Sequence, residues 1–210
     1  MGTLLAVVAY FWRDLWQLAV GLRHKDGASI RYFGMIVIAS VPTAVLGLLL
    51  RPWVEDAIRS PRAASGFLLL TAAALFATKY LTEGNRFSAD INWPTALLVG
   101  LAQGVAVFPG VSRSGITIAA ALAAKIERDS AFRFSFLISI PAIAGAFCLE
   151  VPDALRNGAL NWTHAGCGFL LAFGVGLLAL WILKKSLAAN WFHHYAWWCL
   201  AAAGVGFIFG

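Results

Sequence analysis

Residues 103–117, Gln-Gly-Val-Ala-Val-Phe-Pro-Gly-Val-Ser-Arg-Ser-Gly-Ile-Thr, place an arginine between two serines in an otherwise apolar part of the chain. An apolar run from Trp93 to Phe108 comes before the Pro109-Gly110 pair, and a second run, from Ile116 to Ala124, follows the arginine. An ionisable side chain inside a bilayer costs about 2.5–3.5 kcal/mol on insertion scales and is a functional-site hypothesis by default. Arg113 is therefore the first candidate for function.

The composition is that of an integral membrane protein. Of the 210 residues, 60% are hydrophobic and only 12% are charged, whereas a soluble chain has about 25% charged residues. The apolar residues come in blocks that approach the roughly 20 residues a spanning helix needs. We predict an all-α, polytopic fold with residues 1–210 as a single membrane domain. The net charge of +6, spread over short loops, favours lipid headgroups over nucleic acid as the basic chain's partner.

The apolar runs predict about six spanning helices. They cover residues 30–50, 63–82, 132–149, 165–183 and 193–209, and residues 1–12 are typical of the last half of another helix. The two runs on either side of the arginine are each too short to span comfortably, so we expect a re-entrant helical hairpin or a broken helix. Gly100 and Gly104 in the first of these runs allow close contact with a neighbouring helix.

The residues after Pro109-Gly110 suit an oxyanion. The Pro-Gly pair stops one helix, and Ser112 or Ser114 can cap the N-terminus of the next. A helix N-terminus offers free backbone N–H groups and the positive end of its dipole to a phosphate. Arg113 adds a fork that can hold two phosphate oxygens, and Thr117 adds a hydroxyl near the start of the helix. One of the serines is also a candidate nucleophile.

Other readings of these residues stay open. Arg113 can instead extend to the lipid headgroups while the serines only cap a helix. Gly110 to Gly115 has the glycine spacing of a P-loop, but no Lys-Ser/Thr pair follows it. Gln103 either faces the oxyanion site or hydrogen-bonds a neighbouring helix. We interpret Arg133, near Glu127 and Asp129, as an interfacial anchor rather than a substrate contact.

The run from Gln103 to Thr117 resembles the Pro-Gly-x-Ser-Arg-Ser-x-x-Thr signature of the undecaprenyl-diphosphate phosphatases of the bacitracin-resistance type. The stretches Phe134–Pro141 and Gly2–Arg13 are similar to that family as well. The resemblance implies a multi-pass enzyme of the bacterial cytoplasmic (inner) membrane. Such an enzyme removes the terminal phosphate of undecaprenyl diphosphate and regenerates the lipid carrier of cell-wall precursors.

The resemblance also implies roles for individual residues. Catalytic roles fall on Arg113, Ser112 and Ser114, with Arg113 stabilising charge on the transferred phosphoryl group. It further implies a divalent cation, Mg²⁺ or Ca²⁺, for which this sequence offers no identifiable ligands. The expected substrate-binding residues are Gln103, Gly110, Ser112, Arg113, Ser114 and Thr117.

The sequence departs from the family in one respect. Members carry an earlier motif, a pair of glutamates four apart followed by a Pro-x-Ser-Ser-x-Gly-His-like run, on a first re-entrant segment, and nothing here matches it. We therefore expect the chain to be the second half of an inverted-repeat fold whose first re-entrant segment is missing. A wrongly chosen start codon or a truncated gene would explain the missing segment. On this hypothesis the intact product is the enzyme, and this chain alone is inactive or nearly so.

Two further functions remain as alternatives. A small transporter or flippase would use a broken helix to pass a phosphate-headed lipid without hydrolysing it, and a structural membrane fragment would do neither. Phosphate release from undecaprenyl diphosphate separates the first of these from the phosphatase. The expected partners are a polyprenyl diphosphate and membrane lipids, a homodimer is left open, and the charges of the loops do not fix the membrane face of the site.

Overall fold

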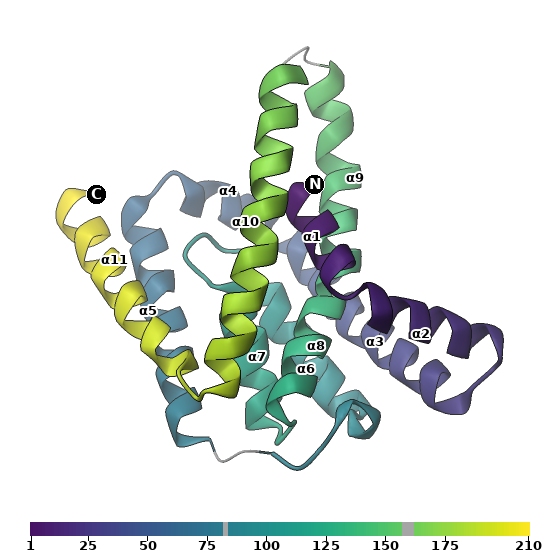
Figure 1. Cartoon of the computed structure of the whole chain (residues 1–210). Helices are drawn as coiled ribbons and strands as arrows, with labels where there is room; N and C mark the ends of the chain where they lie inside the picture. Colours follow the sequence, from purple (N-terminus) through teal and green to yellow (C-terminus); the bar gives the residue numbers. More distant parts are fainter. Residues whose placement is uncertain (82–83, 157–161) are drawn as a thin grey trace.

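The computed structural model describes residues 1–81, 84–156 and 162–210, and within them the fold is all-α (Figure 1), as predicted. The α-helices are α1 (Gly2–Tyr10), α2 (Trp12–Arg23), α3 (Gly27–Leu49), α4 (Arg51–Ile58), α5 (Pro61–Ala77), α6 (Trp93–Val105), α7 (Arg113–Ala123), α8 (Arg128–Leu137), α9 (Ser139–Arg156), α10 (Trp162–Ala188) and α11 (Tyr195–Phe209). Short 3-10 turns are η1 (Thr78–Tyr80), η2 (Ser88–Asp90) and η3 (Phe192–His194).

Polar residues begin the helices that surround the site. Side-chain oxygens of Asp26, Ser60, Asn92, Ser112 and Glu127 accept backbone N–H groups in the first turns of α3, α5, α6, α7 and α8, in that order. These residue types are favoured N-caps because they satisfy N–H groups that have no partner within the helix. The helix starts are thus fixed by local sequence.

Four segments in the described residues are long and apolar enough to cross a bilayer. They are residues 27–49, 61–80, 128–149 and 165–188, which confirms a polytopic membrane fold but with fewer full-length spans than the six expected. The difference lies at the two ends of the chain. Helix α11 has 15 residues and is therefore only about 22 Å long, against the roughly 30 Å of a hydrocarbon core, and α1 has 9 residues.

The segment expected as one span over residues 132–149 is a broken helix. Helix α8 ends at Leu137 and α9 starts at Ser139, two residues before Pro141. Pro141 has no N–H to donate to the carbonyl of Leu137, so the hydrogen-bond ladder of a continuous helix is interrupted here. The break exposes backbone carbonyls to side chains of other helices.

The α6–α7 hairpin lies between two long helices, with α6 against α3 and α7 against α5 (Figure 1). Its first arm approaches α3 closely, as the two glycines predicted. A Cβ on Gly100 would collide with the backbone of Ala39, and one on Gly104 would collide with Leu46. Both arms, of 13 and 11 residues, are too short to span, which agrees with the expected re-entrant hairpin.

Candidate functional site

The hairpin tip, residues 106–112, carries the turn that the sequence predicted. Helix α7 begins at Arg113, and Ser112 Oγ accepts the backbone N–H of Gly115 at 3.2 Å. Ser112 is therefore the N-cap, while Ser114 lies inside the first turn. The arginine and both serines are half-buried.

Gly110 gives the tip its sharp turn. Its φ of +92° lies in the left-handed region, which residues with a Cβ rarely adopt. A Cβ at this position would also collide with the backbone carbonyl of Ala64 on α5. The glycine thus lets the tip pack directly against α5. Its role in the site is to form the backbone turn that precedes α7.

Arg113 turns back toward the protein and hydrogen-bonds two neutral oxygens. Its Nε donates to Gln103 Oε1 at 3.0 Å, and its Nη2 donates to the backbone carbonyl of Ser139 at 3.2 Å. The second acceptor lies at the break between α8 and α9, where the helix backbone is irregular. Neither bond cancels the charge of the guanidinium, and Arg113 forms no ion pair with the described side chains, those of residues 1–81, 84–149 and 165–210.

Gln103 is the centre of a buried relay that holds this arginine. Its side chain is only 2% exposed. Its Nε2 donates to Thr43 Oγ1 on α3 at 3.1 Å and to the carbonyl of Ile138 at 3.2 Å. Thr43 in turn hydrogen-bonds the carbonyl of Gly100 at 3.0 Å. The sequence left open whether Gln103 faces the oxyanion site or hydrogen-bonds a neighbouring helix. It does both, because it contacts Arg113 and also links α6 to α3 and to the backbone between α8 and α9.

The remaining candidates differ in what their hydroxyls do. Thr117 is fully buried, and its Oγ1 donates to the carbonyl of Arg113 at 2.8 Å, within its own helix. Ser112 Oγ is engaged as the cap. The hydroxyl of Ser114 makes no hydrogen bond within the described part of the chain, so it is free to contact a ligand.

The tip presents several donors and no negative side chain. Residues 93–124 contain no Asp, Glu, His or Cys. The backbone N–H groups of Arg113 and Ser114 open α7 and have no acceptor among the residues described. Together with the unneutralised guanidinium and the dipole of α7, they form a site that can bind a phosphate or diphosphate and stabilise added negative charge.

These residues do not provide a resident site for a divalent cation. Across the described residues, no three His, Cys, Asp or Glu side chains gather closely enough to hold a metal ion. Mg²⁺ in phosphate sites is commonly held by one or two carboxylates together with the substrate's phosphates. The tip supplies no such carboxylate, so we assign no protein ligand to the cation.

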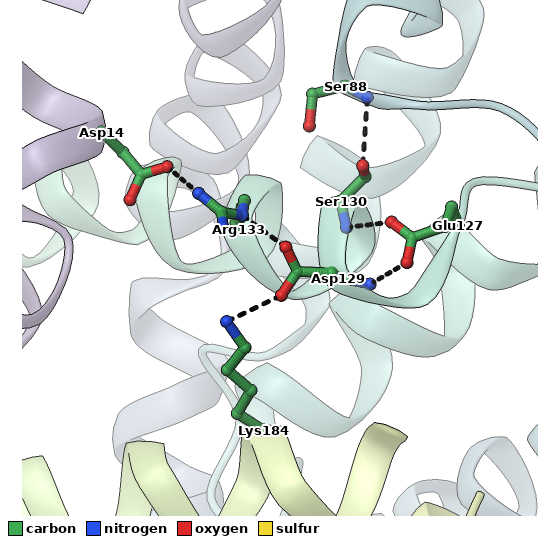
Figure 2. A network of polar contacts seen from close by, with 7 residues as sticks. All are labelled: Asp14, Ser88, Glu127, Asp129, Ser130, Arg133 and Lys184. Carbon is green, nitrogen blue, oxygen red and sulfur yellow. Dashed lines mark hydrogen bonds and ion pairs between the residues drawn. The ribbon is translucent and has the colours of Figure 1, made fainter. Parts of the chain in front are cut away.

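A second polar cluster surrounds Arg133 on α8 (Figure 2). Here the guanidinium pairs with two carboxylates, Asp14 on α2 through Nη1 and Asp129 through Nε at 2.6 Å. Lys184 on α10 also pairs with Asp129, at 2.9 Å. Glu127 caps α8 by accepting from the N–H groups of Asp129 and Ser130. The cluster joins α2, α8 and α10 through ion pairs, and the expected role of Arg133 as an interfacial anchor stays a prediction.

A cavity of about 460 Å³ opens beside this cluster. Its polar lining includes Asp14, Gln17, Tyr32, Ser88 and Arg133. Because Arg133 and Asp14 are paired with each other, the cavity offers no net charge to an ion. It differs in this respect from the hairpin tip.

The sequence reasoning missed the residues that hold the site in place. They are Thr43 on α3, Thr71 on α5 and the carbonyls of Ile138 and Ser139. Pro141 was a usable signal for a helix break next to these carbonyls, because a proline inside a helix removes the hydrogen bond to the carbonyl four residues earlier, here that of Leu137. Nothing in the local sequence distinguishes Thr43 or Thr71 from other threonines in apolar helices.

Comparison with known proteins gives a consistent result over nearly the whole chain. The model of a family described as bacitracin resistance protein BacA matches residues 1–205. An undecaprenyl-diphosphatase of Desulforapulum autotrophicum is 36% identical over 225 residues, covering 100% of this chain and 82% of that protein. One from Moorella thermoacetica is 39% identical over 188 residues, covering 89% of this chain and 71% of that protein.

Proposed function

The chain belongs to the bacitracin resistance protein BacA family, and we propose that it is an undecaprenyl-diphosphate phosphatase. It hydrolyses the lipid diphosphate to the lipid monophosphate and inorganic phosphate, as a multi-pass protein of the bacterial cytoplasmic membrane. The observation that carries this proposal is the unneutralised Arg113 at the N-terminus of α7, on a short hairpin between spanning helices. The transport alternative is not favoured, because the relatives are named as diphosphatases.

The geometry suits phosphoryl transfer to water. Water adds its oxygen to the terminal phosphorus, the bond from this phosphorus to the bridging oxygen breaks, and the lipid monophosphate leaves with that oxygen. Charge grows on the leaving and equatorial oxygens during this step, so fixed donors aimed at them lower the barrier. The free guanidinium N–H groups of Arg113, the N–H groups that open α7 and the Ser114 hydroxyl are such donors.

The divalent cation remains part of the proposal without a protein ligand. The described residues form no metal-binding group, so no step above depends on the ion. We propose that a cation, where it takes part, arrives on the phosphate oxygens of the substrate. Omitting Mg²⁺ or Ca²⁺ from the assay measures its contribution.

The deciding experiment is phosphate release from undecaprenyl diphosphate by the purified chain in detergent with magnesium. We expect release that saturates with the lipid and is lost in Arg113→Ala. A wild-type chain that binds the lipid but releases no phosphate would contradict the phosphatase proposal for residues 1–210 and would agree with the expectation that this chain alone is inactive. Transfer of the intact lipid diphosphate between vesicle leaflets, without release, would support the flippase instead.

A further inference from the structure

One face of α5 contacts the hairpin tip. The carbonyl of Ala64 lies where a Cβ of Gly110 would be, and the ring of Phe67 stacks on Phe108 with centroids 4.6 Å apart. One turn further along α5, Thr71 is fully buried and hydrogen-bonds the tip. Positions 64, 67 and 71 follow the spacing of a single helix face. Helix α5 is therefore the surface on which the tip rests.

The hydroxyl of Thr71 contacts both ends of the turn. It donates to the carbonyl of Gly110 at 2.9 Å and accepts the backbone N–H of Ser112 at 2.9 Å. A hydroxyl has one hydrogen and two lone pairs, so it can make both of these bonds at once. The carbonyl of Phe67, at 3.2 Å, is a second acceptor within α5.

These two bonds act directly on the residues of the phosphate site. Ser112 caps α7 through its side chain, and Arg113 follows it in the chain. The direction of the N–H groups that open α7 depends on the backbone of Ser112, and that backbone is held by Thr71. A small displacement of catalytic donors costs much of their effect, because stabilisation of a transition state depends on preorganised geometry.

We propose that Thr71 is a positioning residue for the diphosphate site, which it orients through the backbone of Gly110 and Ser112. The inference rests on the proposed function, since the reaction defines what is positioned. Thr71 itself contacts neither the substrate nor the attacking water and acts only through the backbone of Gly110 and Ser112. Its hydroxyl, rather than its bulk, is the part that matters.

The chain contains a matched control for this threonine. Thr78 lies seven residues further on, is 5% exposed, and donates to the carbonyl of Leu75 at 2.6 Å. Both threonines thus hydrogen-bond a carbonyl of the same helical segment, but only Thr71 also contacts the tip. Thr71→Val and Thr78→Val remove the same atoms from similar surroundings.

The test compares kcat, KM and thermal unfolding for wild type, Thr71→Val, Thr71→Ser and Thr78→Val. We expect Thr71→Val to lower kcat about tenfold or more, because the N–H of Ser112 loses its acceptor. Thr71→Ser, which keeps the hydroxyl, should stay within about twofold of wild type, and Thr78→Val should keep its kcat. Equal kcat for the two valine variants, or failure of serine to rescue, would overturn the proposal.

Hydrogen exchange separates this inference from the proposed function. Peptides covering residues 106–115 should exchange faster in Thr71→Val than in wild type or Thr78→Val, and binding of inorganic diphosphate should weaken in the same variant. If wild type releases no phosphate, the phosphatase proposal fails, and these two measurements still decide whether Thr71 orders the tip. Unchanged exchange in that peptide would refute the positioning role whatever the activity.

Discussion

Two arginines, 20 residues apart in the chain, are held in opposite ways. Arg113 at the hairpin tip donates to an amide oxygen and a backbone carbonyl, both neutral. Arg133, near the middle of α8, donates to two carboxylates, and Lys184 pairs with one of them (Figure 2). The charges of the four paired side chains, Asp14, Asp129, Arg133 and Lys184, cancel, whereas the charge at the tip is retained.

The difference separates a binding charge from a structural one. Neutral oxygens satisfy the N–H groups of a guanidinium at membrane depth but do not neutralise its positive charge, which is left for a bound anion to neutralise. Carboxylates accept hydrogen bonds from the same N–H groups and also neutralise the positive charge. An anion arriving at the tip therefore gains a full charge interaction, while at the cluster around Arg133 it would have to displace Asp14 or Asp129.

Removing the charge at the tip should have the largest effect. We expect Arg113→Ala to lower turnover by about 10²-fold or more, the size of effect seen when one donor to the transition state is lost. Arg113→Lys should recover only part of this, because an ammonium lacks the planar fork that contacts both Gln103 and Ser139. Phosphate release under single-turnover conditions measures the change, and near-normal release from the alanine variant would remove Arg113 from the mechanism.

Giving the tip a carboxylate should make it resemble the cluster around Arg133. Gln103→Glu keeps the shape of the side chain but places a negative charge against Arg113. The lipid diphosphate must then compete with an internal anion, so KM should rise about tenfold or more, which corresponds to about 1.4 kcal/mol. Gln103→Met, which loses the hydrogen bonds without adding charge, is the control. A larger increase in KM for methionine than for glutamate would contradict the electrostatic account.

Breaking the charge cluster around Arg133 should affect stability rather than activity, and only slightly. The Arg133 side chain is 38% exposed, and ion pairs at that exposure are worth about 1 kcal/mol or less. We expect Arg133→Gln to lower the Tm in detergent by about 2–4 °C per kcal/mol lost, with kcat within about twofold of wild type. Lys184→Gln, which removes one outer pair, should have a smaller effect. A large loss of activity at unchanged Tm would assign Arg133 to the reaction.

Much of the architecture could be predicted because it depends on local sequence. The Pro109-Gly110 pair between two short apolar runs predicts the hairpin, and the serines on either side of the arginine predict that one of them caps the next helix. The structure confirms both features. The glycines of α6 also predicted close packing, since small residues let two helix backbones approach each other closely.

The contacts that orient the site could not be predicted, because they join residues far apart in the chain. Thr71 reaches Ser112 across 41 positions, and Thr43 reaches Gln103 across 60. A threonine in an apolar helix usually donates to its own helix, as Thr78 does, so its sequence context carries no sign of a second partner. Likewise, the break at Ile138 is visible in the sequence as Pro141, but not the identity of the side chains that use it.

The turn at Gly110 limits which residues the sequence can carry at this position. Two independent requirements meet at one position, a left-handed φ of +92° and the absence of a Cβ beside the Ala64 carbonyl. A neighbouring change that made room for a methyl group would leave the backbone strain, and one that relaxed the backbone would leave the collision. No single second-site change relieves both, so among homologous chains with this tip, glycine here should tolerate no replacement. Gly145 and Gly174, which have no atom within 4 Å of a Cβ, should vary freely.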